Sequence, residues 1–178
     1  MTQKDYLLDT NIIRYICELE LGIKSKESLA LKKRLKSLPS NSSLFLSSIT
    51  LGEVEYGVRV GPFRNDESDK YISLMTILNR YHSFDLNSNV ARDYYAELRS
   101  RLYKKYASKS KKEKRSDKKR IEEWNYPTTS LELQIQENDV WITAIAWAYN
   151  LILVTNDEMT PIKNVVGDEI EFENWLRQ

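Results

Sequence analysis

Four acidic residues stand beside the apolar runs of this sequence and are its first candidates for chemistry. Asp9 ends the run YLLD, Asp157 follows LILVTN, and Asp139 directly precedes VWITAIA. Glu53 comes shortly after LFLS, within the segment SSITLGEVEYG. Carboxylates brought together in a fold repel one another, and a bound divalent cation removes that conflict. Carboxylate and water oxygens are ligands that suit Mg²⁺ or Mn²⁺ better than zinc.

A magnesium or manganese ion held in this way lowers the pKa of a bound water and neutralises a phosphate during in-line attack. The chemistry that fits this combination best is hydrolysis of a phosphodiester without a covalent protein intermediate. The chain has one histidine, His82, and one cysteine, Cys17. We interpret His82 as an ordinary, partly buried histidine and Cys17 as a small buried residue on an apolar helix face. Carboxylates must therefore carry the chemistry if the chain is an enzyme.

Each acid also has a purely structural interpretation. Asp9 can cap a helix, and Asp139 suits a helix N-terminus, where the helix dipole favours an acid. Glu53 follows Thr50 at the spacing of a capping box, and Asn156–Asp157 is a common turn pair. These separate roles leave unexplained why all four positions converge in the predicted fold.

That convergence comes from the elements that must position the acids. Apolar runs predict strands at 5–9, 44–47, 83–86 and 151–155, with a last short one near 169–172. Helical periodicity predicts helices at 11–21, 27–38, 50–60, 66–81, 88–103 and 138–150. Strands that alternate with helices predict an α/β fold with a central, mostly parallel sheet flanked by helices. Ligands bind beyond the carboxyl ends of parallel strands, the edge at which we expect the four acids to meet.

The composition is that of a globular chain. It has 178 residues, of which 41% are hydrophobic and 30% charged, and we expect one domain over residues 1–178. No apolar run approaches the roughly 18 residues of a membrane span. The N-terminal segment lacks the pattern of a secretory signal, and we therefore expect a cytoplasmic protein without membrane partners. Only five glycines occur, and none forms a phosphate-cradling pattern, which disfavours a dinucleotide or P-loop enzyme.

Four segments of the chain together resemble a known family. They are LLDTNIIRYI, SSITLGEVEYGV, ENDVWITAIAWAYNLILVTND and EIEFENW. In this order, and over most of the chain, they resemble the PIN-domain ribonucleases, specifically the VapC-type toxins of type II toxin–antitoxin systems. The resemblance implies a PIN-like three-layer sandwich that acts as a Mg²⁺- or Mn²⁺-dependent endoribonuclease. It also implies a homodimer, and a small antitoxin that inhibits the enzyme by occupying the groove of the active site.

The resemblance also assigns roles to residues. Asp9, Glu53, Asp139 and Asp157 occupy the positions of the acids that hold the metal ion. Thr10 and Asn11 are the polar neighbours of the first acid, and Asn156 is the neighbour of the last. Thr143 stands where the family usually has alanine, a change that we expect to be neutral.

The chain departs from the family between about residues 104 and 136, where its connection is longer than usual. We interpret this stretch as a partly flexible insertion. Ten Lys/Arg and two acids between Lys104 and Arg120 give it a local charge of +8, against +1 for the whole chain. Its cations could bind RNA phosphates or could simply be a solvated surface. The candidates for RNA contact are Lys111, Lys112, Lys114 and Arg115.

Two alternatives to a ribonuclease remain at this stage. A phosphatase or phosphoryl-acceptor domain also places acids at strand ends, but Asn11 stands where a dehalogenase-like phosphatase needs a second acid. The stronger alternative is a PIN-like scaffold that binds RNA or a partner without cutting. The loss of one acid would have indicated such a scaffold, whereas this sequence has all four.

Overall fold

The computed structural model describes the backbone of residues 4–60, 68–107, 120–129 and 131–177. The chain divides into two compact units. The first comprises residues 1–85, 151–157 and 171–178, and the second comprises residues 86–150 and 158–170. The four cations proposed to contact RNA, Lys111, Lys112, Lys114 and Arg115, lie outside the described residues. Whether residues 1–178 behave as one domain stays a prediction.

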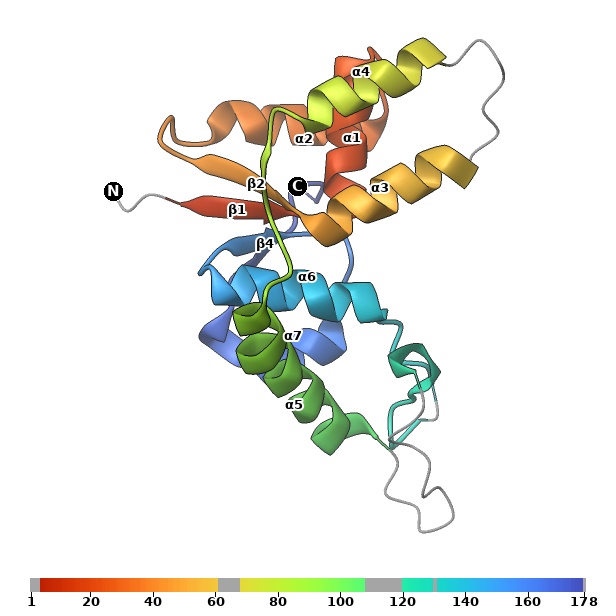
Figure 1. The fold of residues 1–178 in the computed structure, drawn as a ribbon, viewed down its shortest axis with the longest axis vertical. Coiled ribbons are helices and arrows are strands. Elements are labelled where there is room, and N and C mark those ends of the chain that lie inside the picture. The colour runs from red at the N-terminus through yellow and green to blue at the C-terminus, as the bar shows by residue number, and fades with distance from the viewer. Residues whose placement is uncertain (1–3, 61–67, 108–119, 130, 178) are drawn as a thin grey trace. The chain divides into compact units, whose positions relative to one another are not determined.

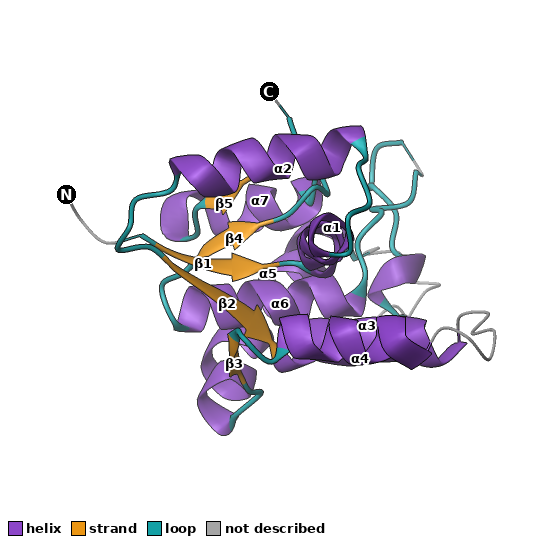
Figure 2. Ribbon diagram, turned by 90° about the horizontal axis from the view of Figure 1, so that it is seen from above, coloured by secondary structure: helices purple, strands orange, loops and turns teal. Residues whose placement is uncertain are grey.

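A five-stranded parallel sheet forms the centre of the first unit. Its strands lie side by side in the order β3-β2-β1-β4-β5 (Figure 2). Their bounds are β1 Asp5–Leu8, β2 Ser43–Ser47, β3 His82–Phe84, β4 Ile152–Val154 and β5 Phe172–Glu173. Every described strand pair is parallel, and Leu7 of β1 pairs with Phe45 on one side and Leu153 on the other. The predicted parallel sheet is therefore confirmed, with the last strand starting about three residues later than expected.

Helices α1 Thr10–Glu20, α2 Lys26–Ser37, α3 Ser48–Val60 and α4 Ser68–Leu78 belong to the same unit (Figure 1). Helix α1 contacts each of the other three. Its apolar residues repeat with helical spacing, so Ile12, Ile13 and Ile16 all face the core and are buried. Cys17 is buried beside them, as predicted. The core of this unit also takes in Trp175, close to the C-terminus.

The second unit is helical. The predicted helix over 88–103 contains a π-helical stretch, Val90–Tyr95, and continues as α5 Ala96–Tyr106. Helices α6 Glu137–Ala148 and α7 Thr160–Val166 and two 3₁₀ turns, Ile121–Glu123 and Gly167–Glu169, complete its described elements. Helix α5 contacts both α6 and α7. Among the described residues no helix is long and apolar enough to cross a membrane.

The later half of the predicted insertion is packed rather than merely solvated. Ile121, Trp124, Leu133 and Ile135 are all buried, and a β-bridge joins Asn125 to Glu132. Between them the chain turns at 127–129. This half of the insertion therefore contributes its own apolar side chains to the second unit.

One prediction about a single side chain is wrong. His82 was expected to be partly buried, whereas its side chain is exposed. The reason is its position: it is the first residue of β3, which lies at the edge of the sheet and pairs with β2 alone. An edge strand leaves one side of its backbone unpaired and exposes its ends to solvent.

Candidate acidic site

Asp9 lies at the junction between β1 and α1 and is only 4% exposed. Its Oδ1 accepts a 2.7 Å hydrogen bond from the Thr10 backbone N–H, so it caps α1 as the sequence suggested. Its Oδ2 accepts from the Thr155 hydroxyl at 2.6 Å and from the Asn11 side-chain amide at 3.0 Å. Burial raises the pKa of Asp9 from 3.8 to about 6, and the charges of Asp157 and Glu53 act in the same direction. The hydrogen bonds from Thr155 and Thr10 oppose that rise.

Asp157 follows β4 and lies beside Asn11, the residue that also contacts Asp9. Because β4 is the parallel neighbour of β1, the carboxyl ends of the two strands lie together at one edge of the sheet. The exposed Asp157 accepts a 3.0 Å hydrogen bond at Oδ2 from the Asn11 amide that also donates to Asp9. The side-chain Oδ1 of Asn11 accepts from the backbone N–H of Asn156 at 3.1 Å. The side-chain amide of Asn11 thus connects the carboxyl ends of β1 and β4.

Glu53 joins the group from α3. Its carboxylate accepts a hydrogen bond from the hydroxyl of Thr10, the residue next to Asp9. The alternative in which Thr50 caps the helix is wrong, because α3 begins at Ser48 and places Thr50 inside it. The Ser47 hydroxyl instead accepts from the Thr50 backbone N–H at 2.9 Å. We call Asp9, Glu53 and Asp157, with Thr10, Asn11 and Thr155 between them, the acidic cluster.

Thr155 belongs to this cluster but is not among the residues that the sequence predicts for the site. Besides donating to Asp9, its hydroxyl accepts from the Asp157 backbone N–H at 3.0 Å and lies 3.3 Å from the Asn11 amide nitrogen. The signal was present, since Thr155 is the polar residue that ends the apolar run LILV directly before Asn156 and Asp157. The predicted strand over 151–155 includes Thr155 as its last residue, whereas β4 ends at Val154.

Asp139 lies in the second unit, in the first turn of α6. Its Oδ2 accepts a 2.7 Å hydrogen bond from the backbone N–H of Gln136, while the Gln136 side chain caps the same turn in return. The structural interpretation of Asp139 as a residue of the helix N-terminus is therefore confirmed locally. Its role beside the other acids stays a prediction.

The donors of the acidic cluster fit a hard divalent cation. The side chains of the cluster carry carboxylate, hydroxyl and amide groups. Their oxygen atoms are the type of ligand that Mg²⁺ or Mn²⁺ prefers. The charges of Asp157 and Glu53 both disfavour the ionised form of Asp9, a conflict that a cation would relieve. Within the described part of the chain, no three His, Cys, Asp or Glu side chains are grouped closely enough to hold a metal ion by themselves.

A cavity of about 410 Å³ adjoins Thr10 and Glu53 in the first unit. The rest of its lining comes from α1, the residue that follows it, α3 and α4: Arg14, Cys17, Glu18, Leu21, Val54, Gly57, Val58 and Leu74. Apolar side chains dominate this lining, and its charged residues are Arg14, Glu18 and Glu53. The cavity thus continues from the acidic cluster along an apolar surface.

Comparison with known proteins identifies the family of this fold. Residues 6–166 match the PIN domain family, a stretch that includes all four predicted acids. The chain belongs to the PIN domain family. This confirms both the resemblance inferred from the sequence and the expected α/β, PIN-like fold class.

Individual PIN-domain relatives cover nearly the whole chain. Ribonuclease VapC2 of Rickettsia felis is 28% identical over 172 residues, or 96% of this chain and 97% of the relative. A crystal structure of VapBC2 from Rickettsia felis, bound to a DNA fragment from their promoter, aligns with a TM-score of 0.64 and 26% identity. That alignment covers 96% of this chain and 98% of the other. VapBC-1 from nontypeable Haemophilus influenzae has the same fold, with a TM-score of 0.62 and 22% identity over 97% and 99% of the two chains.

Proposed function

We propose that this PIN-domain protein is a metal-dependent endoribonuclease that hydrolyses RNA phosphodiester bonds. The observation that supports this most directly is the acidic cluster, in which Asn11 links Asp9 to Asp157 and Thr10 links the same strand end to Glu53. The relative in Rickettsia felis is named a ribonuclease, and its alignment extends over the positions of all four acids.

In this proposal Asp9, Glu53, Asp139 and Asp157 hold Mg²⁺ or Mn²⁺. The ion, when bound, supplies an activated water and neutralises charge on the phosphate that is attacked. The residues around the acids orient them: the Thr155 hydroxyl and the Asn11 amide fix the Asp9 carboxylate, and Thr10 holds Glu53. The assignment of Asp139 rests on the resemblance to the family. Asp139 belongs to the second unit, and its carboxylate accepts a hydrogen bond from the Gln136 backbone N–H at the start of α6.

We further propose that the enzyme is the toxin of a toxin–antitoxin pair and that its activity takes place in the cytoplasm. The relatives of known structure include VapBC complexes. The apolar cavity beside Thr10 and Glu53 supports an antitoxin that docks across α1, α3 and α4 and reaches the acids. A homodimer is part of the same proposal, and the molar mass in solution would test it.

The decisive experiment is cleavage of a mixed pool of tRNA, rRNA and mRNA by the purified protein. It is run with Mg²⁺, with Mn²⁺ and with EDTA, beside Asp9→Asn. We expect discrete cuts that require the divalent cation and disappear in the variant. The cut positions then begin to name the substrate.

The alternative is a PIN-domain scaffold that binds RNA or a partner without cutting. Equal inertness of the wild type and of Asp9→Asn on every RNA, with both proteins folded, would favour this scaffold over the enzyme. RNA binding by the same two proteins would then separate an RNA-binding scaffold from one that binds only a protein partner.

A further inference from the structure

In the C-terminal segment after β5, the side chain of Asn174 contacts Asn156, the residue next to Thr155 and Asp157 of the acidic cluster. Its Nδ2 lies 3.2 Å from Oδ1 and 3.4 Å from the backbone oxygen of Asn156, and it donates to both. Asn156 is the residue between Thr155 and Asp157, at the bend that follows β4. The contact joins positions that are 18 residues apart, so it exists only because β5 pairs with β4.

Asn174 is itself held by its other amide atom. Its Oδ1 accepts from the backbone N–H of Leu176 at 2.9 Å and of Arg177 at 3.2 Å. The side chain therefore uses its oxygen to close a turn of its own segment and its nitrogen to hold the bend at Asn156. An aspartate in this position would keep the acceptor for the turn and lose the donor for the bend.

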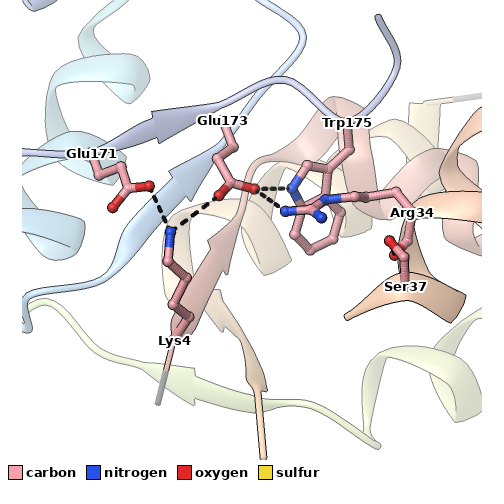
Figure 3. A network of polar contacts seen from close by, with 6 residues as sticks. All are labelled: Lys4, Arg34, Ser37, Glu171, Glu173 and Trp175. Atoms are coloured by element: carbon pink, nitrogen blue, oxygen red, sulfur yellow. Dashed lines mark hydrogen bonds and ion pairs between the residues drawn. The ribbon is translucent and has the colours of Figure 1, made fainter. Parts of the chain in front are cut away.

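The segment around Asn174 is anchored strongly enough to serve as a fixed support. Trp175 is 4% exposed and packs edge-on against Tyr6, with ring centroids 5.1 Å apart. Figure 3 shows Glu173 between three partners: it accepts from the Trp175 indole at 2.6 Å and pairs with Arg34 at 2.8 Å and with Lys4 at 3.8 Å. Lys4 also pairs with Glu171 at 2.9 Å, so residues on both sides of β5 are fixed to the first strand and to α2.

From this support a chain of amides leads to the acids. Asn174 holds Asn156, the backbone N–H of Asn156 donates to Asn11, and the Asn11 amide donates to Asp9 and Asp157. Asp157 is exposed at a bend, so its carboxylate is held towards Asp9 by these hydrogen bonds together with the one from its backbone N–H to the Thr155 hydroxyl.

We propose that Asn174 is a positioning residue of the acidic site, which holds the Asn156–Asp157 bend so that Asp157 faces Asp9. This inference rests on the proposed ribonuclease function for its effect on catalysis, but its structural part is independent of that function. Small misplacements of a catalytic group have large costs in rate, on the order of 100-fold for about 1 Å.

The test uses the full-length protein with two substitutions, Asn174→Asp and Asn174→Ala. Asn174→Asp is the sharper variant because it retains the acceptor for Leu176 and Arg177. The control is Glu171→Gln, which alters an exposed ion pair of the same segment and leaves the contact with Asn156 intact. For each protein, NMR measures hydrogen exchange of the Asn156 and Asp157 backbone amides without metal, and RNA cleavage gives kcat and KM.

We expect both Asn174 variants to exchange these two amides faster, by on the order of 10-fold, and to lower kcat by on the order of 10- to 100-fold with KM nearly unchanged. Glu171→Gln should match the wild type in both measurements. Combining Asn174→Ala with Asn156→Ala should cost less than the sum of the two single effects, because both remove the hydrogen bond between the two side chains, although Asn156→Ala keeps the backbone oxygen as an acceptor.

Unchanged amide exchange in the folded Asn174→Asp protein would overturn the proposal, as would a loss of kcat that is fully additive with Asn156→Ala. If the wild type cuts no RNA, the ribonuclease proposal fails. The exchange rates then still decide whether Asn174 holds the bend.

Discussion

The side-chain amide of Asn11 donates a 3.0 Å hydrogen bond to a carboxylate oxygen of Asp157, a residue 146 positions away in the chain. The same nitrogen donates to Asp9 at an equal distance. Two carboxylates that would repel each other are thus held around one neutral donor. Position 11 carries an amide rather than a further acid, so it adds no negative charge beside Asp9 and Asp157. This arrangement is compatible with a cation shared by the two acids.

Asn11→Ala should therefore damage the site more than the fold. Loss of the amide leaves Asp9 and Asp157 without their shared donor, and we expect kcat for RNA cleavage to fall by on the order of 10- to 100-fold. Steady-state cleavage kinetics give the effect, and circular dichroism verifies the fold. Asn79→Ala, at an exposed amide residue after α4, is the matched control and should retain full activity.

Asp9→Asn should stabilise the metal-free protein at neutral pH while it abolishes cleavage. The pKa of Asp9 is raised to about 6 in the folded state, chiefly by burial, so the ionised carboxylate costs stability there. That cost is absent below the ordinary pKa of 3.8, grows as the pH rises between the two values, and is complete above about pH 6. Thermal unfolding in EDTA should show a higher Tm for the variant at pH 7.5 and a smaller difference at pH 5. A lower Tm for the variant at pH 7.5 would mean that the lost hydrogen bonds outweigh the relieved charge.

Thr143→Val should stabilise the second unit. Thr143 is fully buried in α6, and its hydroxyl has no hydrogen-bond partner among the described residues. Valine keeps the shape of the side chain and removes the unsatisfied hydroxyl, so we expect a gain of about 1 kcal/mol in the free energy of unfolding. Thr143→Ala also removes a methyl group and should gain less, because it leaves a small void. Urea denaturation of the three proteins gives the comparison, and a loss of stability in the valine variant would show that the hydroxyl does have a partner.

If the proposed antitoxin docks in the apolar cavity beside Thr10 and Glu53, Val58→Asp should weaken its binding without reducing RNA cleavage. Val58 lines the apolar cavity next to the acidic cluster, and a buried charge there would oppose docking of an apolar segment. We expect the affinity for the proposed antitoxin to fall by on the order of 100-fold, measured by calorimetry and by inhibition of cleavage. Val60→Asp is the control on the same helix, at a position that is 61% exposed and outside the lining of the cavity. Equal effects of the two substitutions would argue against docking in the cavity.

Neutralising Lys111, Lys112, Lys114 and Arg115 to glutamine should weaken RNA binding and flatten its dependence on salt. Each phosphate contact with a single strand contributes about 0.7 to the slope of log affinity against log salt concentration, so four contacts predict a loss of about 3. Binding is measured with Asp9→Asn, which should not cut the RNA. An unchanged slope would rule these cations out as phosphate contacts.

The sequence alone was sufficient for the parallel sheet, the family and the local setting of Asp9 and Asp139, but not for that of Glu53. Continuous apolar runs such as LILVT predict buried parallel strands, and an acid directly after such a run must lie at the carboxyl edge of the sheet. Asp9 as a helix cap and Asp139 in the first turn of α6 follow from equally local rules, and both are observed. Local rules succeeded here because strands and helix ends depend mainly on neighbouring residues.

Only the tertiary structure decided which side chains meet. Thr155 and Asn174 belong to the surroundings of the acids through contacts set by strand pairing. The sequence marks Thr155 only as the polar end of an apolar run and does not show that its hydroxyl binds Asp9. The exposure of His82 follows from the place of β3 at the sheet edge, which its own three residues do not encode. The choice of Ser47 over Thr50 as the residue that precedes α3 depends on where β2 ends. These outcomes share a cause: hydrogen bonds between distant residues depend on the strand order, and no local pattern specifies it.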